Sequence, residues 1–510
     1  MAPQIIRLPD GQSYTVTPVF AGLFFKSHEL STHTNAFPIG WSVVLHTEDD
    51  VGEAPPSADA ETRPHVHSFT RPTLQNDNLF ISSISNPSSN DFKPATSPTR
   101  QIAMMLWVTL YWYFHQPEPP SILHTEASKL TPESGKPRGE WRINIKRDGV
   151  LRGRNLIPKL ERMGLICTLD SAVGAAMDDS EGWSRMFVSR KMFWQIPGRL
   201  FLFTLQPNAS KPVHSHPGSP TSSRPGSPAI GEPARPQLSP TLSHSTAADL
   251  PGAPPPMTLT STPTYPIGPF YSSSHLPTYY PPAPPYYIMT DNIRHPVRPK
   301  PPRMGEVFYT RFVHSVGQYL SFRVASLSPK PVPHMGPIGP KPPSQLDLQT
   351  LSDTSLLQKW LANPRVSAFW GGYEHDFLTN ALASKHSFPV IGMWDGVPFG
   401  YFEIYWVKED ALGRYIGGCD AADWDRGFHV FIGEDWARGR VQPWLTSLVH
   451  WSFCSDYRTM SICVEPRVDN KRFIQHLQYA GFSKGKEISF PHKQAWFGRL
   501  RRDAWDGPAL

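Results

Sequence analysis

Residues 399–482 constrain the fold of this chain more than any other part of it. Apolar runs rich in aromatic and β-branched residues alternate here with helical patterns, which is typical of an α/β unit. We expect strands at residues 427–434 and 459–465, with a helix at residues 438–453 between them. A second helix is expected over residues 470–481, because an Asn suits its start and a Gly suits its end.

Four sequence words in this region carry a resemblance to a known family. They resemble the GNAT superfamily and, within it, the siderophore acyltransferases that acylate a hydroxylamine or lysine nitrogen. The words are GYFEIYW (400–406), DWDRGFHVFIGE (423–434), ARG (437–439) and VEPRVDNKRFIQHLQYAGF (464–482). The block at residues 316–326 is similar to the fungal hydroxyornithine acyltransferases, which are larger proteins with an added N-terminal half. The resemblance implies an α/β (α+β) fold of the GNAT acyl-CoA N-acyltransferase type.

A chain of 510 residues is too long for one ordinary domain, so two domains and a linker are expected. By analogy, residues 1–206 are predicted to form a degenerate GNAT-like α/β domain that shapes the acceptor cleft. Residues 207–303 are predicted to be a Pro/Ser-rich disordered insertion. Return strands and a crossover linker are expected at 304–345, and the catalytic GNAT domain at 346–510.

Local patterns refine this division. In the N-terminal half, residues 98–115 predict a helix with an apolar side, stopped by Pro117. Residues 187–195 and 199–205 are expected to pair as strands. In the C-terminal half, the Asp395-Gly396 dipeptide between two apolar runs predicts a β-hairpin.

The insertion differs in composition from both halves. It contains repeated Ser-Pro and Pro-Pro pairs and few aliphatic residues, so it cannot bury enough apolar area to offset chain entropy. Ser219, Ser227 and Ser239 each precede a proline, which suits proline-directed phosphorylation as well as an unmodified linker. His214 and His216 lie in this segment and are not spaced as metal ligands, and no metal is expected elsewhere.

Composition and termini bear on the class of protein. The net charge of +6 favours anionic partners such as CoA phosphates but also fits a generic protein, and without a basic block no nucleic acid is expected. Four cysteines without CxxC spacing indicate reduced thiols. The N-terminus lacks an apolar signal core and no run of about eighteen apolar residues exists. The C-terminus Gly-Pro-Ala-Leu is not a peroxisomal signal of the SKL type, so a cytoplasmic location without membrane contact is expected.

A phosphate-binding turn is predicted between the strand at 427–434 and the following helix. A helix N-terminus offers free backbone N–H groups to the pyrophosphate of CoA, and Arg438, Gly439 and Arg440 stand at that point. The general GNAT pattern Q/R-x-x-G-x-G/A is met only in part, because a single glycine is present. An ordinary helix start with solvated arginines remains the alternative. The resemblance adds Asn470 and Arg472, after the next strand, as CoA contacts.

His429 is the main catalytic candidate. A lone histidine inside an apolar strand is more often a structural residue than a base. The resemblance changes that weight, since a His of this G-x-H word and an acidic residue ending the next strand are the proposed catalytic pair. Here the acidic residue is Glu465. We predict that His429 is the general base and that Glu465 orients it or positions the amine.

Further residues near the two strands are candidates for substrate binding, each with a structural role as the equal alternative. Two alternate with core residues along one strand, two are tryptophans that suit the wall of an acceptor site, and two are aspartates that suit an α-amino group. They are Glu403, Tyr405, Trp406, Asp423, Trp424 and Asp425.

Two functions of different classes are compatible with these patterns. The first is an enzyme that uses acetyl-CoA or another acyl-CoA to acylate the side-chain hydroxylamine of N5-hydroxyornithine in siderophore biosynthesis. The resemblance covers acetyl and anhydromevalonyl transfer, and the absent peroxisomal signal and long insertion favour acetyl. The second is a non-catalytic GNAT-like scaffold, against which the retained His429 and Glu465 argue. A homo-oligomer is left open.

Overall fold

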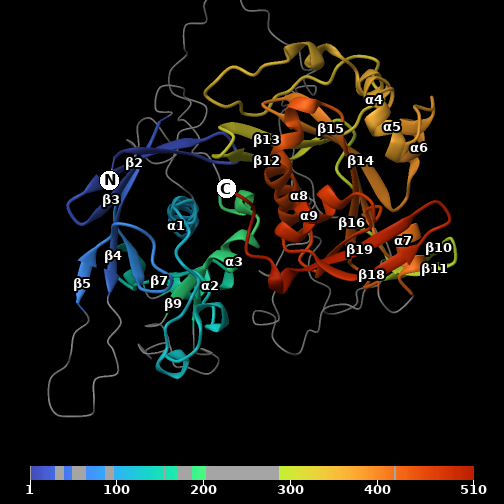
Figure 1. Ribbon diagram of the computed structural model, residues 1–510. Helices are drawn as coiled ribbons and strands as arrows, with labels where there is room; N and C mark the ends of the chain where they lie inside the picture. Colours follow the sequence, from blue (N-terminus) through green and yellow to red (C-terminus); the bar gives the residue numbers. More distant parts are fainter. Residues whose placement is uncertain are drawn as a thin grey trace, which may run out of the picture. The chain divides into compact units, whose positions relative to one another are not determined.

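The computed structural model of this chain describes residues 2–28, 40–48, 65–86, 97–153, 155–168, 186–202, 286–417 and 421–510 (Figure 1). Within these residues the chain forms a nine-stranded sheet, an eight-stranded sheet and a two-stranded hairpin. Along the chain, helices alternate with the strands of both large sheets. The predicted mixed α/β class is therefore confirmed.

The N-terminal sheet has the strand order β1-β2-β3-β4-β6-β7-β9-β8, with β5 paired to β4. Alternating burial along β2 and β3 shows one face turned to the core, as expected for a half-buried strand. The strands are β1 (Gln4–Arg7), β2 (Ser13–Val19), β3 (Gly22–Ser27), β4 (Gly40–Glu48), β5 (Val66–Ser68), β6 (Asp77–Ser85), β7 (Arg142–Ile145), β8 (Cys167–Thr168) and β9 (Met186–Ser189).

Three α-helices accompany the described part of this sheet. Helix α1 (Pro98–Tyr113) agrees with the prediction; Ser97 caps it by accepting a hydrogen bond from the Arg100 N–H, and Pro98 starts its first turn. Helix α2 is Leu156–Arg162. The predicted strand at residues 187–195 was wrong beyond Ser189, because the Ser189 side chain caps helix α3 (Arg190–Trp194) there. Its predicted partner, 199–205, is wrong at its start, because Gly198–Leu200 forms a 3-10 turn, and residues 203–205 lie outside the described residues.

The C-terminal sheet has the order β12-β13-β14-β15-β16-β17-β19-β18. Its strands are β12 (Val307–Val313), β13 (Gln318–Val324), β14 (Ser387–Trp394), β15 (Val397–Trp406), β16 (Arg426–Ile432), β17 (Ser461–Val464), β18 (Ser483–Ser489) and β19 (Gln494–Arg501). Strands β12 and β13 pair with each other and with β14, so this sheet begins well before the expected boundary at residue 346. They are the strands expected within residues 304–345, and they belong to the C-terminal sheet.

Helices lie on both sides of this sheet (Figure 1). Helices α8 and α9 lie on one side and α4, α5 and α6 on the other. Their bounds are α4 (Asp353–Leu361), α5 (Pro364–Trp370), α6 (Phe377–Ala383), α7 (Ala411–Tyr415), α8 (Val441–Ser455) and α9 (Lys471–Tyr479). The hairpin predicted from Asp395-Gly396 joins β14 to β15, and both turn residues have positive φ, as a two-residue hairpin turn requires.

The hairpin β10 (Tyr287–Thr290) and β11 (Ile293–Pro296) corrects the predicted extent of the insertion. Residues 203–285 lie outside the described part of the chain, but residues 286–303 are described and include this hairpin. Asp291 and Asn292 form its turn with positive φ, a conformation that these residue types tolerate. The segment that follows the hairpin is held in place by Arg298, which donates to both carboxylate oxygens of Glu409 at 2.6 Å. Proline density alone therefore overestimated disorder.

Candidate active site

Strands β15 and β16 give the C-terminal sheet two chemically different faces. Strand residues alternate between faces, and Glu403 pairs directly with His429 in the antiparallel register, so the two side chains share one face. Tyr401 and Tyr405 lie on that face too. We call it the dyad face, after the pair of His429 and Glu465 described below. The other face packs against α8, as shown by the edge-to-face contact of Phe402 with Trp444. We call it the α8 face.

The neighbouring strands β16 and β17 run parallel but pair over only two positions, Arg426 with Ile462 and Gly427 with Cys463. Beyond these positions the ladder stops while both strands continue. His429 and Glu465 stand on the two sides of the point where the strands part. The sheet itself therefore creates an opening next to these two side chains.

His429 and Glu465 form a close pair across this opening. The Nε2 atom of His429 lies 2.6 Å from Oε1 of Glu465. The His429 side chain is 31% exposed, whereas that of Glu465 is 4% exposed. The carboxylate is held inside the protein and the imidazole faces outward from it, as expected for a residue that orients a proton-transferring histidine.

Two further groups fix the Glu465 carboxylate. Tyr405 donates its hydroxyl proton to Oε2 at 2.7 Å, and the Lys493 ammonium lies 3.5 Å from Oε1 and donates to the Glu465 carbonyl at 2.9 Å. Gly427 makes room for the tyrosine, because a Cβ there would lie 2.2 Å from the Tyr405 ring. The glycine of the G-x-H word thus has a packing role, which is to seat Tyr405 beneath the pair.

Glu403 is the second carboxylate near the imidazole. Its Oε2 lies 3.4 Å from Nδ1 of His429, and its Oε1 accepts the Tyr401 hydroxyl at 2.7 Å. The distance to Nδ1 is longer than the 2.7–2.9 Å that is typical of charge-assisted bonds. Nδ1 is therefore the less tightly held of the two ring nitrogens.

These contacts set the protonation state of the pair. Burial acts to lower the pKa of His429, but the charge of Glu465 and hydrogen bonds to Glu403 and Glu465 outweigh it and raise the pKa above its ordinary value. Burial acts to raise the pKa of Glu465, but His429, Lys493 and the Tyr405 hydroxyl lower it. The resting pair is thus an imidazolium and a carboxylate near neutral pH. His429 must release a proton before it can accept one.

The start of helix α8 is open to an anion. Its cap residue, Arg440, makes no side-chain capping bond, in contrast to Ser97 at the start of α1, and Val441 and Gln442 carry the first N–H groups because Pro443 has none. Arg438 is exposed in the preceding 3-10 turn, and a Cβ at Gly439 would meet no atom within 4 Å. The exposed cation, the bare glycine and the uncapped helix start together suit a phosphate.

Arg440 is directed elsewhere. It donates to Gln318 Oε1 at 2.6 Å, and its guanidinium lies 5.2 Å from the ring centres of both Trp394 and Trp436. Of the two arginines predicted to contact CoA, the geometry therefore favours Arg438.

The two CoA candidates after β17 stand at the start of helix α9. Asn470 precedes the helix but forms no side-chain cap, and Arg472 is exposed in its first turn. Gln442 in α8 donates to the carbonyl of His476 in α9 at 2.8 Å, which ties the two helices together.

Four of the predicted substrate residues do not join the pair. Trp406 lies on the α8 face. Asp423 accepts the Tyr287 hydroxyl at 2.5 Å and also bonds Lys408, so it anchors the β10–β11 hairpin. Trp424 stacks against Arg458, with the guanidinium 3.4 Å from the ring centre. Burial raises the pKa of Asp425, which accepts a bond from the Ala422 N–H. These residues hold the structure around the start of β16, and only Glu403 and Tyr405 reach the dyad.

Sequence reasoning missed three residues of the site. Tyr401 follows the same alternation as Glu403 and Tyr405, so strand periodicity was a signal for it. Lys493 comes from the β18–β19 connection, and Trp370, whose ring centre lies 6.3 Å from that of His429, ends helix α5. No local pattern connects these two to β16, because only the tertiary fold brings them together.

Among the described residues, no group of three or more His, Cys, Asp or Glu side chains is arranged to hold a metal ion. Over the same residues, no helix combines the length and apolar character needed to span a membrane.

Comparison with known proteins places these residues in context. Residues 349–490 match the model of the acetyltransferase (GNAT) domain. The N5-hydroxyornithine acetylase sidL of Beauveria bassiana is 55% identical over 97% of this chain and 100% of its own length. The N(6)-hydroxylysine O-acetyltransferase of Escherichia coli is 36% identical over 38% of this chain and 56% of that protein. The N(5)-hydroxyornithine:cis-anhydromevalonyl coenzyme A-N(5)-transacylase SIDF of Beauveria bassiana is 33% identical over 41% of this chain and 42% of that protein.

Proposed function

This chain belongs to the family of GNAT acyltransferases that includes the N5-hydroxyornithine acetylase sidL, and we propose that it acetylates the side-chain hydroxylamine nitrogen of N5-hydroxyornithine with acetyl-CoA. The product is a hydroxamate for siderophore biosynthesis. The observation that carries the proposal is the His429–Glu465 pair, 2.6 Å apart where β16 and β17 part. A thioester and an amine that meet in this opening lie beside a ready proton carrier.

Binding of acetyl-CoA is assigned to the start of helix α8. The uncapped first turn and the Arg438 guanidinium bind the pyrophosphate, and Asn470 and Arg472 are further candidates for the same cofactor. Helix α8 directly follows β16 and its 3-10 turn, so a CoA anchored there extends its thioester along the opening toward His429. The protein thereby supplies proximity and orientation, which contribute much of the rate in acyl transfer.

The chemical step forms an N–C bond, breaks the C–S bond and moves one proton from nitrogen to sulfur. The hydroxylamine is less basic than an alkylamine, so it arrives uncharged and can attack directly. Because the resting imidazole is protonated, His429 first gives a proton to the departing thiolate and then takes one from the acylated nitrogen. Glu465 keeps the ring oriented throughout, and Glu403 faces the less tightly held nitrogen Nδ1.

The acyl group is the main alternative within this proposal. Anhydromevalonyl transfer occurs in a named relative, but that similarity covers 41% of this chain, whereas similarity to the acetylase covers 97%. Full-length similarity favours acetyl transfer. A non-catalytic scaffold is disfavoured, since such a protein has no use for an imidazole held between two carboxylates.

The proposal is tested with purified protein, N5-hydroxyornithine and a panel of acetyl-, propionyl- and anhydromevalonyl-CoA. We expect thiol release that depends on both substrates, fastest with acetyl-CoA, and a product whose mass is that of the acetylated hydroxamate. N6-hydroxylysine and ornithine serve as matched acceptors that change chain length and remove the hydroxyl group. Faster turnover of another thioester would reassign the acyl group, and faster turnover of ornithine would reassign the acceptor.

A further inference from the structure

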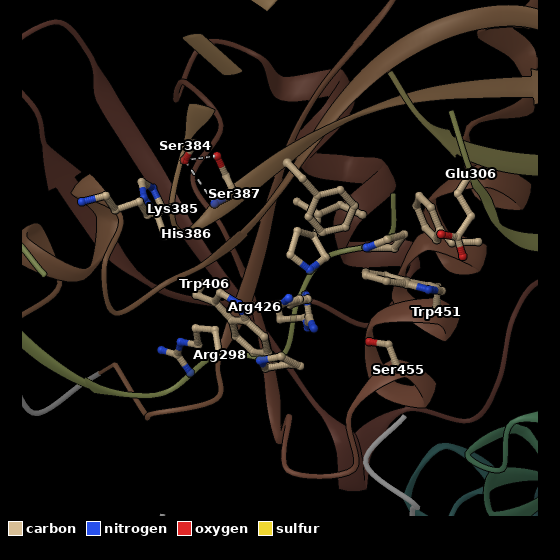
Figure 2. Close-up of a pocket in the computed structure, with 17 residues that line it drawn as sticks. Arg298, Glu306, Ser384, Lys385, His386, Ser387, Trp406, Arg426, Trp451 and Ser455 are labelled. Atoms are coloured by element: carbon tan, nitrogen blue, oxygen red, sulfur yellow. Dashed lines mark hydrogen bonds between the residues drawn. The ribbon is translucent and has the colours of Figure 1, made fainter. Parts of the chain in front are cut away.

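A pocket lies on the α8 face of the C-terminal sheet, so β15 and β16 separate it from His429. Figure 2 shows Trp406 and Arg426 at its centre and Trp451 on helix α8 opposite them. The segment 298–302, which follows the β10–β11 hairpin, closes one side. The strands are paired at this level, Trp406 with Arg426, so no passage leads through the sheet to the dyad.

Arg426 is the unusual residue in this pocket. It is 6% exposed, its Nε has no hydrogen-bond partner, and its guanidinium lies 3.7 Å from the ring centre of Trp406 and 5.0 Å from that of Trp451. The charge of Asp456 acts on it, but that carboxylate is hydrogen-bonded to Arg458 at 2.8 and 2.9 Å. A nearly buried guanidinium whose Nε–H group is unpaired is costly, because that group has given up water without gaining an acceptor.

Other buried arginines of this domain have acceptors within the fold, and among them Arg311 donates to the Ser447 hydroxyl at 2.9 and 3.1 Å. Arg298 donates to both oxygens of Glu409, and Arg323 donates to both oxygens of Asp353 at 2.7 and 2.8 Å. For Arg298 and Arg323 the fold provides a carboxylate in the bidentate geometry that a guanidinium prefers. At Arg426 the corresponding position is the pocket itself, which indicates that the acceptor comes from outside the chain.

The rest of the lining describes the body of such a ligand. Phe308 and Phe388 form an aromatic wall, with ring centres 4.7 and 5.8 Å from that of Trp451. Lys300 and Lys385 are exposed at the pocket, and Glu306 is the acidic residue that lines it. The balance of charge is positive, and the walls are flat and apolar. This combination suits an anion that carries an apolar or aromatic group.

We propose that this pocket binds a small organic acid, with its carboxylate on Arg426 and its apolar body against Phe308, Phe388 and Trp451. The two tryptophans cover the faces of the guanidinium, so its in-plane N–H groups remain for the ligand. A carboxylate is planar and accepts two parallel bonds from this edge. The site lies outside the acyl-transfer centre and is therefore a second binding site of the C-terminal domain.

Benzoate is the probe, because it joins a planar carboxylate to a flat apolar ring. Benzamide is its control, since it has nearly the same shape and no charge. We expect saturable binding of benzoate to the full chain by isothermal titration calorimetry, with a rise in the unfolding temperature, and no such response to benzamide. No acyl-CoA is needed, so the result is independent of the proposed acetyl transfer.

Variants connect the response to one side chain. Arg426→Met removes the charge but keeps an apolar contact to the tryptophans, and it is expected to weaken benzoate binding tenfold or more. Arg426→Lys keeps the charge without the fork and should bind with intermediate affinity, which provides a second readout if the methionine variant does not fold. Arg502→Met is the matched control. Arg502 also stacks on a ring, that of Phe453, but it donates to three backbone carbonyls.

We expect Arg502→Met to lower the unfolding temperature and to leave benzoate affinity unchanged. For the Arg426 variants, the loss of benzoate affinity should be the larger effect and the change in unfolding temperature the smaller one. Equal binding of benzoate and benzamide to the unmodified protein would overturn the proposal. Unchanged benzoate affinity in Arg426→Met or Arg426→Lys would overturn it too, and would leave Arg426 as an aromatic brace between Trp406 and Trp451.

Discussion

The two large sheets of this protein have the same topology and different contents. In each, five strands follow one another antiparallel, a sixth joins in parallel, and the last two are antiparallel in exchanged order. Strands β6 and β7 of the N-terminal sheet correspond to β16 and β17, and helix α1 lies between the first pair as α8 does between the second. This correspondence supports the prediction that the N-terminal half is a degenerate GNAT-like domain.

The parallel pairing aligns individual residues of the two sheets. Asn78 pairs with Asn144 as Arg426 pairs with Ile462, so the position of His429 corresponds to Ile81. The same register matches Glu403 to Val43 and Tyr405 to Leu45, and it matches Glu465 to Arg147. Ile81, Val43 and Leu45 are all fully or almost fully buried. At three of these four positions the C-terminal sheet carries a polar side chain where the N-terminal sheet carries a buried apolar one.

The opening between the parallel strands differs as well. In the N-terminal sheet a 3-10 turn, Gly149–Arg152, lies against β6, and a Cβ at Gly149 would be 2.3 Å from the Ile81 carbonyl oxygen. Leu151 in this turn is completely buried. The gap that β16 and β17 leave beside His429 is therefore filled in the N-terminal half. The strand order therefore provides a frame, and a few side chains decide whether that frame holds an active site.

The largest effect is expected when the dyad loses its histidine. We expect His429→Gln to lower kcat about 10²–10⁴-fold, the usual size of acid–base catalysis, because no proton carrier then stands between sulfur and nitrogen. The KM for acetyl-CoA should stay near the wild-type value, since the cofactor is held at α8. Steady-state kinetics by thiol release measure both. Unimpaired kcat in a folded variant would show that His429 has a structural role, as Ile81 has at the corresponding position of the other sheet.

A second expectation concerns the open start of α8, in contrast to the start of α1 that Ser97 caps. Arg438→Ala should raise the KM for acetyl-CoA about tenfold, since a charge-assisted contact contributes roughly 1.5–3 kcal/mol. The KM for hydroxyornithine should change little. Arg440→Ala is the matched control, because that side chain binds Gln318, and it should leave the KM for acetyl-CoA near wild type. Equal effects of the two variants would contradict the assignment to Arg438.

Much of this frame was predictable from the sequence, and the reason is local. The strands around His429, helix α8 and the hairpin at Asp395-Gly396 follow from periodicity, capping and turn residues, which act over a few neighbours. Glu403 and Tyr405 could be placed near the site by alternation along β15.

What failed depended on contacts distant in sequence. Trp406 was predicted to line the acceptor site, but its odd offset from Glu403 puts it on the α8 face. The ordered hairpin after residue 286 is held by Glu409 and Asp423, which lie far along the chain. Lys493 reaches Glu465 only through the return of β19. Composition and spacing carry no information about such partners.

The pH dependence sharpens the contrast between a charged pair and an apolar one. A histidine with a raised pKa keeps its proton as the pH rises and loses it only when the pH passes that value, so the wild-type rate should stay level between about pH 7 and 9. Glu465→Gln removes the main charge that raises the pKa, so its rate should fall severalfold across this interval. The kcat profiles of both proteins measure this. A wild-type rate that instead falls on the acidic side, near the ordinary histidine pKa of about 6.5, would restore the simple general-base role.

The smallest effect on activity is expected in the N-terminal sheet, at the position that corresponds to His429. Ile81→Val removes one buried methylene, so it should lower the free energy of unfolding by about 0.5–1.5 kcal/mol. The kcat and both KM values should remain within about twofold, because Ile81 packs in a filled gap and touches no reactant. Urea unfolding and steady-state kinetics on the same preparation separate the two outcomes. A loss of turnover that exceeds the loss of folded protein would show that the filled gap takes part in the reaction, and the two sheets would then differ less in role than their side chains indicate.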